Sequence, residues 1–302
     1  MSFRSDRVWT FEDSNFTRVQ SYVAHRTSQD LHSLFIELLQ NGVHGFCFSI
    51  YEDGQQPGDI ISREQVERRM NILKPYTQWI RSFSTTEGNE WVPIVAKNNN
   101  MKTLVGAWLG NDEEKNRIEI DNLIKLGKEG YIDIAAVGNE VLYRKDLSTQ
   151  QLVAHIKKVK DALPGIPVGY IDAYYEFVDH PEISDLCDMI LCNCYPYWEG
   201  TDFEHSLAHM QSMYDQAKSA AKGKPVIITE TGWPSQGEGL KNALPSEEYA
   251  LQYFINTQLW AADEDIDIFY FSSFDESWKV GAEGTVGAYW GIWDKNEKLK
   301  FI

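Results

Sequence analysis

The sequence predicts an α/β protein built as a single (β/α)8 barrel, and three observations support this fold. The chain has 302 residues, which suits one large α/β domain. Eight short runs of apolar, β-branched or aromatic residues alternate with segments of helical periodicity. No Gly-, Ser- or Pro-rich linker divides the series. A doubly wound sheet is the competing fold, but neither a dinucleotide-binding glycine motif nor a P-loop follows any strand.

The eight predicted strands are short and bounded by turn residues. In chain order they are Val43–Ile50, Trp79–Ser84, Thr103–Leu109, Ile132–Gly138, Pro167–Ile171, Met189–Cys194, Val226–Thr229 and Ile266–Phe274. Such near-continuous apolar runs are typical of parallel strands that are covered on both faces.

Amphipathic helices are predicted between these strands. Ser28–Gln40 precedes the first strand and is stopped by Asn41-Gly42. Asn111–Glu114 opens a second helix with acidic residues that complement the helix dipole. Ser148–Gln151 resembles a capping box that starts a third. The residues expected to face the core are Ile118, Leu123, Ile124 and Leu126 in the second helix, and Leu152, Val153, Ile156 and Val159 in the third.

The two ends of the chain are expected to belong to the same domain, which spans residues 1–302. Residues 1–27 form an N-terminal extension that packs on the barrel. Tyr289–Ile302 is expected to be a hairpin around Asp294–Asn296, and the acidic run Asp263–Asp265 a loop at the barrel bottom. The N-terminus lacks the apolar region of a signal peptide, which fits a cytoplasmic protein or a trimmed chain, so the localisation stays open. Asn15–Thr17 is a glycosylation sequon, meaningful only in a secreted eukaryotic protein.

The composition disfavours several classes of partner. A net charge of −17 and a pI near 4.8 disfavour nucleic acid and anionic membranes, whereas a neutral substrate is not repelled. No apolar run reaches the roughly 18 residues of a membrane span. We expect a monomer.

The sequence also lacks the patterns of a cofactor or metal protein. The four cysteines have no zinc-site or disulfide-framework spacing and are expected to be small buried thiols. His205 and His209 stand one helical turn apart but have no third ligand, so a solvated helix face is expected. No calcium, haem or nucleotide motif appears, so no metal and no cofactor are predicted.

Two glutamates end predicted strands and indicate an active site. Glu140 follows the fourth strand and Glu230 follows the seventh. A carboxylate at the end of a buried strand is costly unless it is paired or used. Active residues of (β/α)8 barrels lie at these carboxyl ends, so the two would face each other across the barrel mouth. A pair of carboxyl groups, one protonated and one ionised, is how most glycosidases cleave sugar bonds. A salt-bridged strand end is the alternative for each.

Residues near these glutamates suit sugar binding. Amide, carboxylate and ammonium groups bind hydroxyls, while indole rings stack on sugar faces. A phenol at the end of the sixth strand could donate a hydrogen bond to the attacking carboxylate. The candidates are Asn139, Trp233, Glu276, Trp278, Lys279 and Tyr195. Each also fits a plain structural role, as part of a solvated loop or an aromatic turn.

Four motifs carry a resemblance to a known family. The run Ile227–Ser235 closely resembles the signature of glycoside hydrolase family 17, the β-1,3-glucanases and related glucanosyltransferases. Gly138–Glu140 resembles the acid/base motif of that family, and Asn193–Pro196 and Phe274–Lys279 resemble its sixth- and eighth-strand motifs. All four stand in the family's order between about Gly42 and Asp294.

The resemblance implies a retaining β-glucan-active enzyme of clan A, with Glu140 as acid/base and Glu230 as nucleophile. It also implies a subsite for the attacked glucose, lined by Asn139, Tyr195, Glu276, Trp278 and Lys279. Tyr51, Asp172 and Tyr174 are weaker candidates for sugar contacts. The Trp-Lys ending of the eighth-strand motif is similar to the bacterial and fungal branch of the family.

The leading hypothesis is therefore a hydrolase of laminarin-type β-1,3-glucan. A transglycosylase would use the same covalent intermediate with a sugar as acceptor. A catalytically dead glucan-binding module and a domain of a larger glucan-remodelling assembly are further alternatives. The loops Glu52–Ser62 and Ser235–Pro245 are expected to flank the mouth and to decide between exo and endo action.

Overall fold

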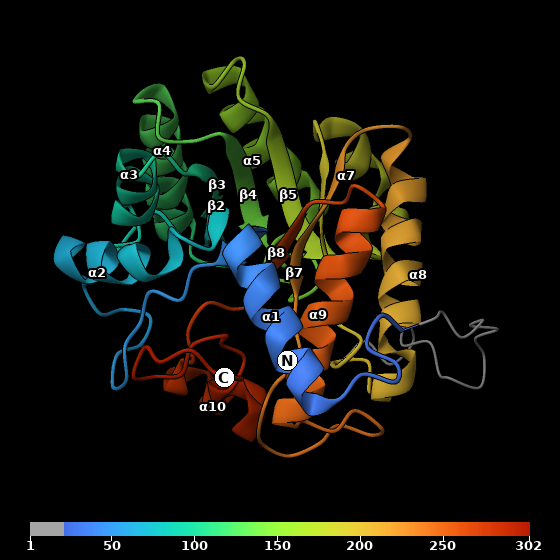
Figure 1. Cartoon of the computed structure of the whole chain (residues 1–302). Helices are drawn as coiled ribbons and strands as arrows, with labels where there is room; N and C mark the ends of the chain where they lie inside the picture. Colours follow the sequence, from blue (N-terminus) through green and yellow to red (C-terminus); the bar gives the residue numbers. More distant parts are fainter. Residues whose placement is uncertain (1–20) are drawn as a thin grey trace.

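The computed structural model describes residues 21–302 and contains a closed barrel of eight parallel strands. Each strand pairs with the next in sequence, and β8 closes on β1 (Figure 1). The strands are β1 Val43–Cys47, β2 Thr77–Ser82, β3 Lys102–Ala107, β4 Ile134–Asn139, β5 Val168–Ala173, β6 Ile190–Asn193, β7 Val226–Thr231 and β8 Ile268–Tyr270. The predicted (β/α)8 barrel is confirmed.

Helices surround the barrel, and short helical turns follow β8. The longer helices are α1 Ser28–Asn41, α2 Arg63–Leu73, α3 Trp91–Asn98, α4 Glu113–Lys128, α5 Thr149–Ala162, α8 Phe203–Ala221 and α9 Glu247–Asp263. The shorter ones are α6 Glu176–Asp179, α7 Pro181–Leu186, η2 Ser277–Lys279, α10 Val280–Glu283 and η3 Thr285–Ala288. Helix α1 lies beside α9, where Phe35 packs edge-on against Phe254 at 5.3 Å, so the first helix closes the ring (Figure 1).

The eighth strand is much shorter than predicted. It ends at Tyr270, because the following residues bond to other parts of the chain. Ser272 donates its N–H to the carbonyl of Trp290, and Ser273 donates to that of Cys47. The expected strand to Phe274 is thus wrong beyond Tyr270. Phe271 still donates its N–H to Thr231 of β7, whereas residues 272–274 bond to the end of β1, to Ser49 after it and to the C-terminal segment.

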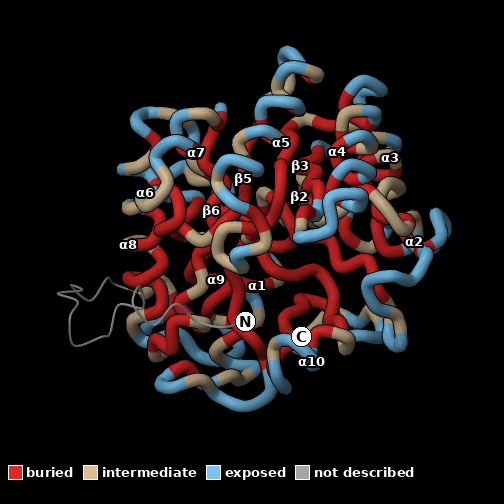
Figure 2. The backbone as a smooth tube through the Cα atoms, turned by 180° about the vertical axis from the view of Figure 1, so that it is seen from behind, coloured by how far each residue is buried: buried red, intermediate tan, exposed pale blue. Residues whose placement is uncertain are grey.

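The helix predictions hold with one exception on α4. Asp112 caps α4, and Ser148 and Gln151 form the predicted capping box of α5. Ile118 was expected to face the core but is exposed, while Ile120 is buried at the position that faces the barrel. The strands and the inward helix faces form one apolar core, shown as buried in Figure 2.

The first described residues and the C-terminal segment both contact the barrel. Tyr22 donates its N–H to Asn256 and its hydroxyl to Asp263, so residues 21–27 are tied to α9. Residues 1–20, including the sequon Asn15–Thr17, lie outside the described residues. The predicted extension over 1–27 therefore stays a prediction. At the other end, Asp294 donates its N–H to the carbonyl of Lys298, which gives the predicted reversal of the chain.

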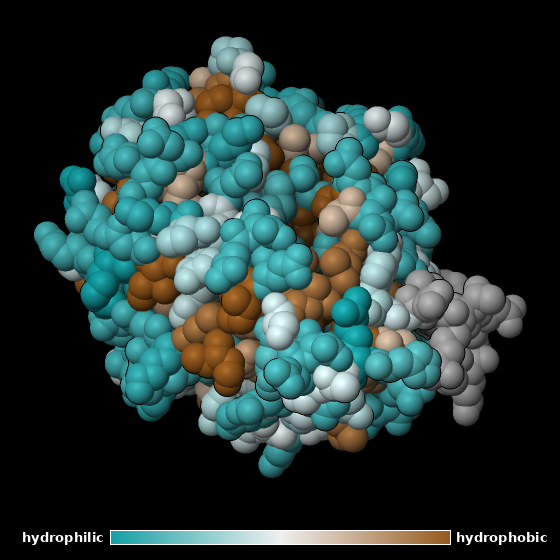
Figure 3. Space-filling model, viewed as in Figure 1, coloured by the Kyte–Doolittle hydropathy of each residue, from teal (hydrophilic) through white to brown (hydrophobic). Residues whose placement is uncertain are grey.

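The character of the surface and the burial of the cysteines match the predictions from the sequence. Figure 3 shows a mostly hydrophilic face with apolar patches between the charged groups. Within residues 21–302 no helix combines the length and apolarity that a membrane crossing requires. All four cysteines are buried and free, as expected for structural thiols. The acidic run Asp263–Asp265 links α9 to β8 at the amino ends of the strands, the predicted position.

Candidate active site

Glu140 and Glu230 meet at the mouth of the barrel, as the sequence predicts. Glu140 directly follows β4, and Glu230 lies near the carboxyl end of β7. The side-chain amide of Asn193 on β6 donates to Oε1 of Glu140 at 3.0 Å and to Oε1 of Glu230 at 3.1 Å. One nitrogen thus lies within hydrogen-bond distance of both carboxyl groups. The two carboxyl groups are therefore close neighbours, as a pair that acts on one glycosidic bond must be.

Glu230 is held by one cation and one phenol. Nη1 of Arg81 lies 2.7 Å from its Oε1, and the Tyr195 hydroxyl donates to its Oε2 at 2.8 Å. Arg81 is fully buried and also donates to the Thr229 carbonyl and to Oδ1 of Asn139. A buried carboxylate with a paired charge and satisfied oxygens is stabilised in its ionised form.

The sequence analysis did not identify Arg81 as a residue of the site, although its position in a predicted strand indicates a buried charge. It stands inside the predicted strand Trp79–Ser84, where a cation is costly without a partner. A barrel strand with an inward arginine predicts a carboxylate inside the barrel. Only the structure shows which one, because the partner lies on β7, far away in sequence.

Glu140 has different surroundings. Burial of its carboxyl group, together with the nearby charge of Glu230, raises its pKa to about 7. Its backbone has a φ of +54°, in the left-handed region, so the chain turns sharply after β4. The site therefore contains one charge-paired carboxylate and one carboxyl group that keeps its proton near neutral pH, the combination needed for acid and nucleophile in one pocket.

A second cluster lies at the ends of β1 and β8. Nζ of Lys279 contacts Oε2 of Glu276 at 2.6 Å and lies 4.2 Å from the centre of the Phe271 ring. Oε1 of Glu276 accepts from the backbone N–H of Tyr51 at 3.2 Å, and the Tyr51 ring packs edge-on against Trp278. The structure thus brings these predicted residues together, with Trp278 half-buried and the others buried.

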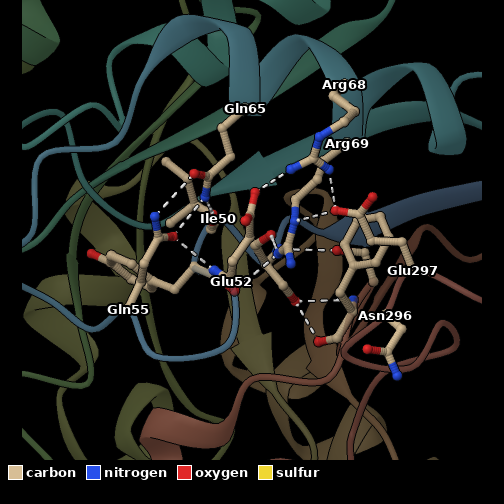
Figure 4. Close-up of polar contacts among 12 residues, drawn as sticks. Ile50, Glu52, Gln55, Gln65, Arg68, Arg69, Asn296 and Glu297 are labelled. Carbon is tan, nitrogen blue, oxygen red and sulfur yellow. Dashed lines mark hydrogen bonds and ion pairs between the residues drawn. The ribbon is translucent and has the colours of Figure 1, made fainter.

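The loop that carries Tyr51 is held by two arginines of α2 (Figure 4). Arg69 donates from Nη1 to the carbonyl of Tyr51 at 3.0 Å and from Nε to Glu297 at 3.1 Å. Arg68 bridges Glu297 and Glu52. Further bonds of this brace run from Arg69 to the Ser49 carbonyl and from Gln65 to the Ile50 carbonyl. The brace fixes the backbone N–H that Tyr51 gives to Glu276.

The chain resembles known glycoside hydrolases over most of its length. A model of the BtgE/BtgC glycoside hydrolase domain matches residues 45–291. A glycoside hydrolase family 17 β-1,3-glucanosyltransferase from Rhizomucor miehei superimposes with a TM-score of 0.77 at 29% identity, covering 86% of this chain and 96% of that one. The chain belongs to glycoside hydrolase family 17.

Curated relatives of this family 17 chain come from fungi. It is 28% identical to a glucan 1,3-beta-glucosidase of Candida albicans over 78% of this chain and 84% of the relative. It is 27% identical to a glucan 1,3-beta-glucosidase of Schizosaccharomyces pombe over 86% of each. The resemblance carried by the four motifs is confirmed.

Close packing explains why the residue at position 232, within the family signature, is glycine. A Cβ on Gly232 would lie 2.1 Å from the carbonyl oxygen of Phe271. Only a residue without a side chain lets β7 approach the end of β8 this closely. The approach keeps Glu230 beside the segment that leads to Glu276.

Three of the residues predicted to contact sugar are buried in the structure. Trp233 is 1% exposed, and its indole N–H donates to the Leu244 carbonyl at 3.0 Å, so it lies in the core beneath the mouth. Asp172 is fully buried and accepts from the N–H groups of Ala173 and Tyr143 and from the Tyr170 hydroxyl. Its bond to Tyr143 holds the turn that follows Glu140. Tyr174, the third weaker candidate, is buried and donates to Glu199.

The histidine pair is corrected as well. His209 is buried, with Nδ1 at 2.6 Å from the Thr201 hydroxyl and Nε2 at 3.0 Å from Glu199, so it does not lie on a solvated face. His205 contacts Asp202, the cap of α8. Across residues 21–302, no group of three or more His, Cys, Asp or Glu side chains could hold a metal ion.

The two loops named from the sequence both lie at the carboxyl ends of strands. Glu52–Ser62 connects β1 to α2, and Ser235–Pro245 connects β7 to α9. They therefore stand on the side of the barrel that carries Glu140 and Glu230.

Proposed function

We propose that this protein is a retaining enzyme that cleaves β-1,3-glucosidic bonds, with Glu230 as nucleophile and Glu140 as acid/base. The observation that carries the proposal is the asymmetry of the carboxyl pair. Glu230 is paired with Arg81 and bonded by Tyr195, whereas burial and the charge of Glu230 hold the pKa of Glu140 at about 7. At one pH, the proposed nucleophile can therefore be ionised while the proposed proton donor keeps its proton.

In the first step Glu140 gives its proton to the glycosidic oxygen while a carboxylate oxygen of Glu230 attacks the anomeric carbon. The bond to the leaving sugar breaks, and a covalent glucosyl ester on Glu230 forms. Glu140 is left ionised. In the second step it takes a proton from the incoming hydroxyl, whose oxygen displaces Glu230 from the same carbon. Two inversions retain the configuration.

The proposal that β-1,3-glucan is the substrate is supported by the names of the related proteins. The Candida albicans and Schizosaccharomyces pombe proteins are named glucan 1,3-beta-glucosidases. An active-site mutant of the Rhizomucor miehei enzyme is described in complex with laminaritriose. A neutral β-1,3-glucan is also compatible with a chain of net charge −17.

Transfer to a sugar is the second candidate, because the Rhizomucor miehei enzyme is a glucanosyltransferase that covers most of this chain. Hydrolysis and transfer share the first step and differ only in the acceptor that Glu140 activates. A binding module without activity is disfavoured, because both glutamates are present and joined by Asn193.

The proposal predicts β-anomeric products from β-1,3-glucan. The protein is incubated with laminarin and with laminari-oligosaccharides of defined length, and the anomeric protons are followed by NMR from the first minutes. Products longer than the starting oligosaccharide would identify transfer, whereas shorter products without any longer ones would identify hydrolysis. Initial α-anomers would contradict the retaining mechanism, and no turnover of any β-1,3-glucan would contradict the substrate class.

We expect activity to fall as the pH rises through about 7. Glu140 must be protonated to donate in the first step, so the rate is full below its pKa and lost above it. Glu140→Gln removes this limb and lowers kcat/KM on laminari-oligosaccharides by about 10²- to 10⁴-fold. An activated aryl β-glucan oligosaccharide, whose leaving group needs no proton, should lose far less in its first step. An unchanged basic limb in the variant would exclude Glu140 as the acid.

A further inference from the structure

One aromatic side chain of residues 21–302 is exposed, and it lies at the mouth of the barrel. Every other Phe, Tyr and Trp in this part of the chain is buried or half-buried, whereas Trp108 is 43% exposed. Trp108 directly follows β3, at the end of the barrel that carries the site. An exposed indole leaves a large apolar surface in water, and a ligand with an apolar face of its own would cover it.

The strand register places Trp108 on the inner face of β3. Arg81 points into the barrel, because it contacts Glu230 on β7, and its register partner on β3 is Leu104. Register partners on adjacent strands share a face, as does every second residue along a strand. Leu104, Gly106 and Trp108 therefore point the same way. Trp108 continues this alternation one residue past the end of β3, so its ring stands at the inner rim of the mouth.

Both the backbone and the ring of Trp108 are held in place. Its backbone N–H donates to Oε2 of Glu119, a buried residue of α4, at 3.1 Å. The guanidinium of Arg144 lies over the indole, with Cζ 4.6 Å from the ring centre. Arg144 in turn donates to the Leu109 carbonyl at 2.9 Å and pairs with Asp146 at 2.7 Å. A fixed cation thus covers one face of the indole, and the exposed area lies on the rest of the ring.

The same arginine connects Trp108 to the proposed proton donor. Arg144 also donates to the carbonyl of Asn139, and its backbone N–H donates to the carbonyl of Glu140 at 2.9 Å. Strands β3 and β4 pair, so Trp108 and Glu140 follow neighbouring strands at the same end of the barrel. Glu140 must face the glycosidic oxygen that it protonates, and this oxygen departs with the leaving sugar. The position of Trp108 beside Glu140 therefore favours the leaving-group side of the cleaved bond.

We propose that Trp108 is a stacking platform for a glucosyl unit on the leaving-group side of the cleaved bond. This inference rests on the proposed function. The CH groups on one face of a β-linked glucose form an apolar surface, which packs on the open face of the indole. Because the ring is already fixed by Glu119 and Arg144, little side-chain freedom is lost when the sugar binds. In a transfer reaction the acceptor sugar would occupy the same place.

The test compares two donors that differ only in what leaves. Laminari-oligosaccharides release a sugar chain, whereas a laminari-oligosaccharyl β-fluoride releases a single fluoride ion, which has no face to stack. Trp108→Ala should lower kcat/KM on the oligosaccharides by about 10-fold, the effect of one lost stacking contact. The same variant should leave kcat/KM on the fluoride unchanged. Trp108→Phe retains a smaller ring, so its kcat/KM on the oligosaccharides should lie between those of the parent and Trp108→Ala.

Ile118→Ala is the matched control, because it removes another exposed apolar side chain, from α4, and should leave both rates unchanged. Thermal unfolding shows that each variant is folded. An equal loss on both donors, or a loss on neither, in folded Trp108→Ala would overturn the inference while the parent still cleaves β-1,3-glucan. If the parent cleaves neither donor, the proposed function itself fails.

Discussion

Replacement of Glu230 by Ala is expected to lower kcat on β-1,3-glucan by at least about 10⁴-fold, because no covalent intermediate can form. Azide should restore activity in a diagnostic way. With Glu230 shortened, azide enters from the nucleophile's side, displaces the leaving sugar and is not itself displaced. The product is an α-glucosyl azide, with inverted configuration. NMR of the isolated azide measures this directly.

The same experiment on Glu140→Ala is the control for the two roles. With an aryl β-glucan oligosaccharide, whose leaving group needs no proton, Glu230 still forms the glucosyl ester in this variant. Azide then replaces the water or sugar that Glu140 would activate. The product is then a β-glucosyl azide. Opposite configurations from the two variants support the assignment. A β-azide from Glu230→Ala would reverse the roles of the two glutamates.

Replacement of Arg81 by Leu is expected to reduce both stability and activity. Arg81 is fully buried, and its removal leaves Glu230 without its paired charge and Asn139 and Thr229 without a donor. Breaking a buried ion pair from one side costs about 3–5 kcal/mol in the free energy of unfolding. Denaturant unfolding at pH 7 measures this cost, and kcat/KM on laminari-oligosaccharides should fall as the nucleophile loses its orientation.

Arg117→Leu is the matched control for this variant. Arg117 lies on α4 with its side chain 57% exposed and pairs with Glu114 and Asp121. Exposed pairs contribute about 0–1 kcal/mol, so stability should change little and activity not at all. Equal losses of stability in the two variants would contradict the role given to Arg81.

The fold could be predicted because its evidence is local. Eight apolar runs separated by amphipathic segments give the barrel, and caps such as Ser148 are readable from a few neighbouring residues. The end of β8 could not be read in this way. The strand predicted to Phe274 stops at Tyr270, because Ser272 donates its N–H to Trp290 in the C-terminal segment and Ser273 donates to Cys47 of β1.

For the site as well, features with local sequence evidence could be predicted, and features that depend on distant contacts could not. The positions of Glu140 and Glu230 follow from strand ends and barrel geometry, and the structure brings the two together. Burial at the level of one side chain does not follow from the sequence. Trp233 and Asp172 lie next to residues of the mouth in sequence. Their own side chains are nonetheless buried in the protein, which the sequence does not reveal. Arg81 depends on a partner, Glu230, that is distant in the chain.

The backbone conformation of Glu140 has a consequence for how such an enzyme can change over generations. A residue other than glycine or asparagine in the left-handed region carries a conformational cost of roughly 1 kcal/mol or more. The chemistry thus occupies a position where an inert residue would fit better. Under the proposed mechanism, mutation to Gly or Asn at this position would relieve the backbone while ending catalysis. Selection for stability alone would then favour a folded, inactive sugar-binding descendant. Activity at this position is maintained only by selection for turnover.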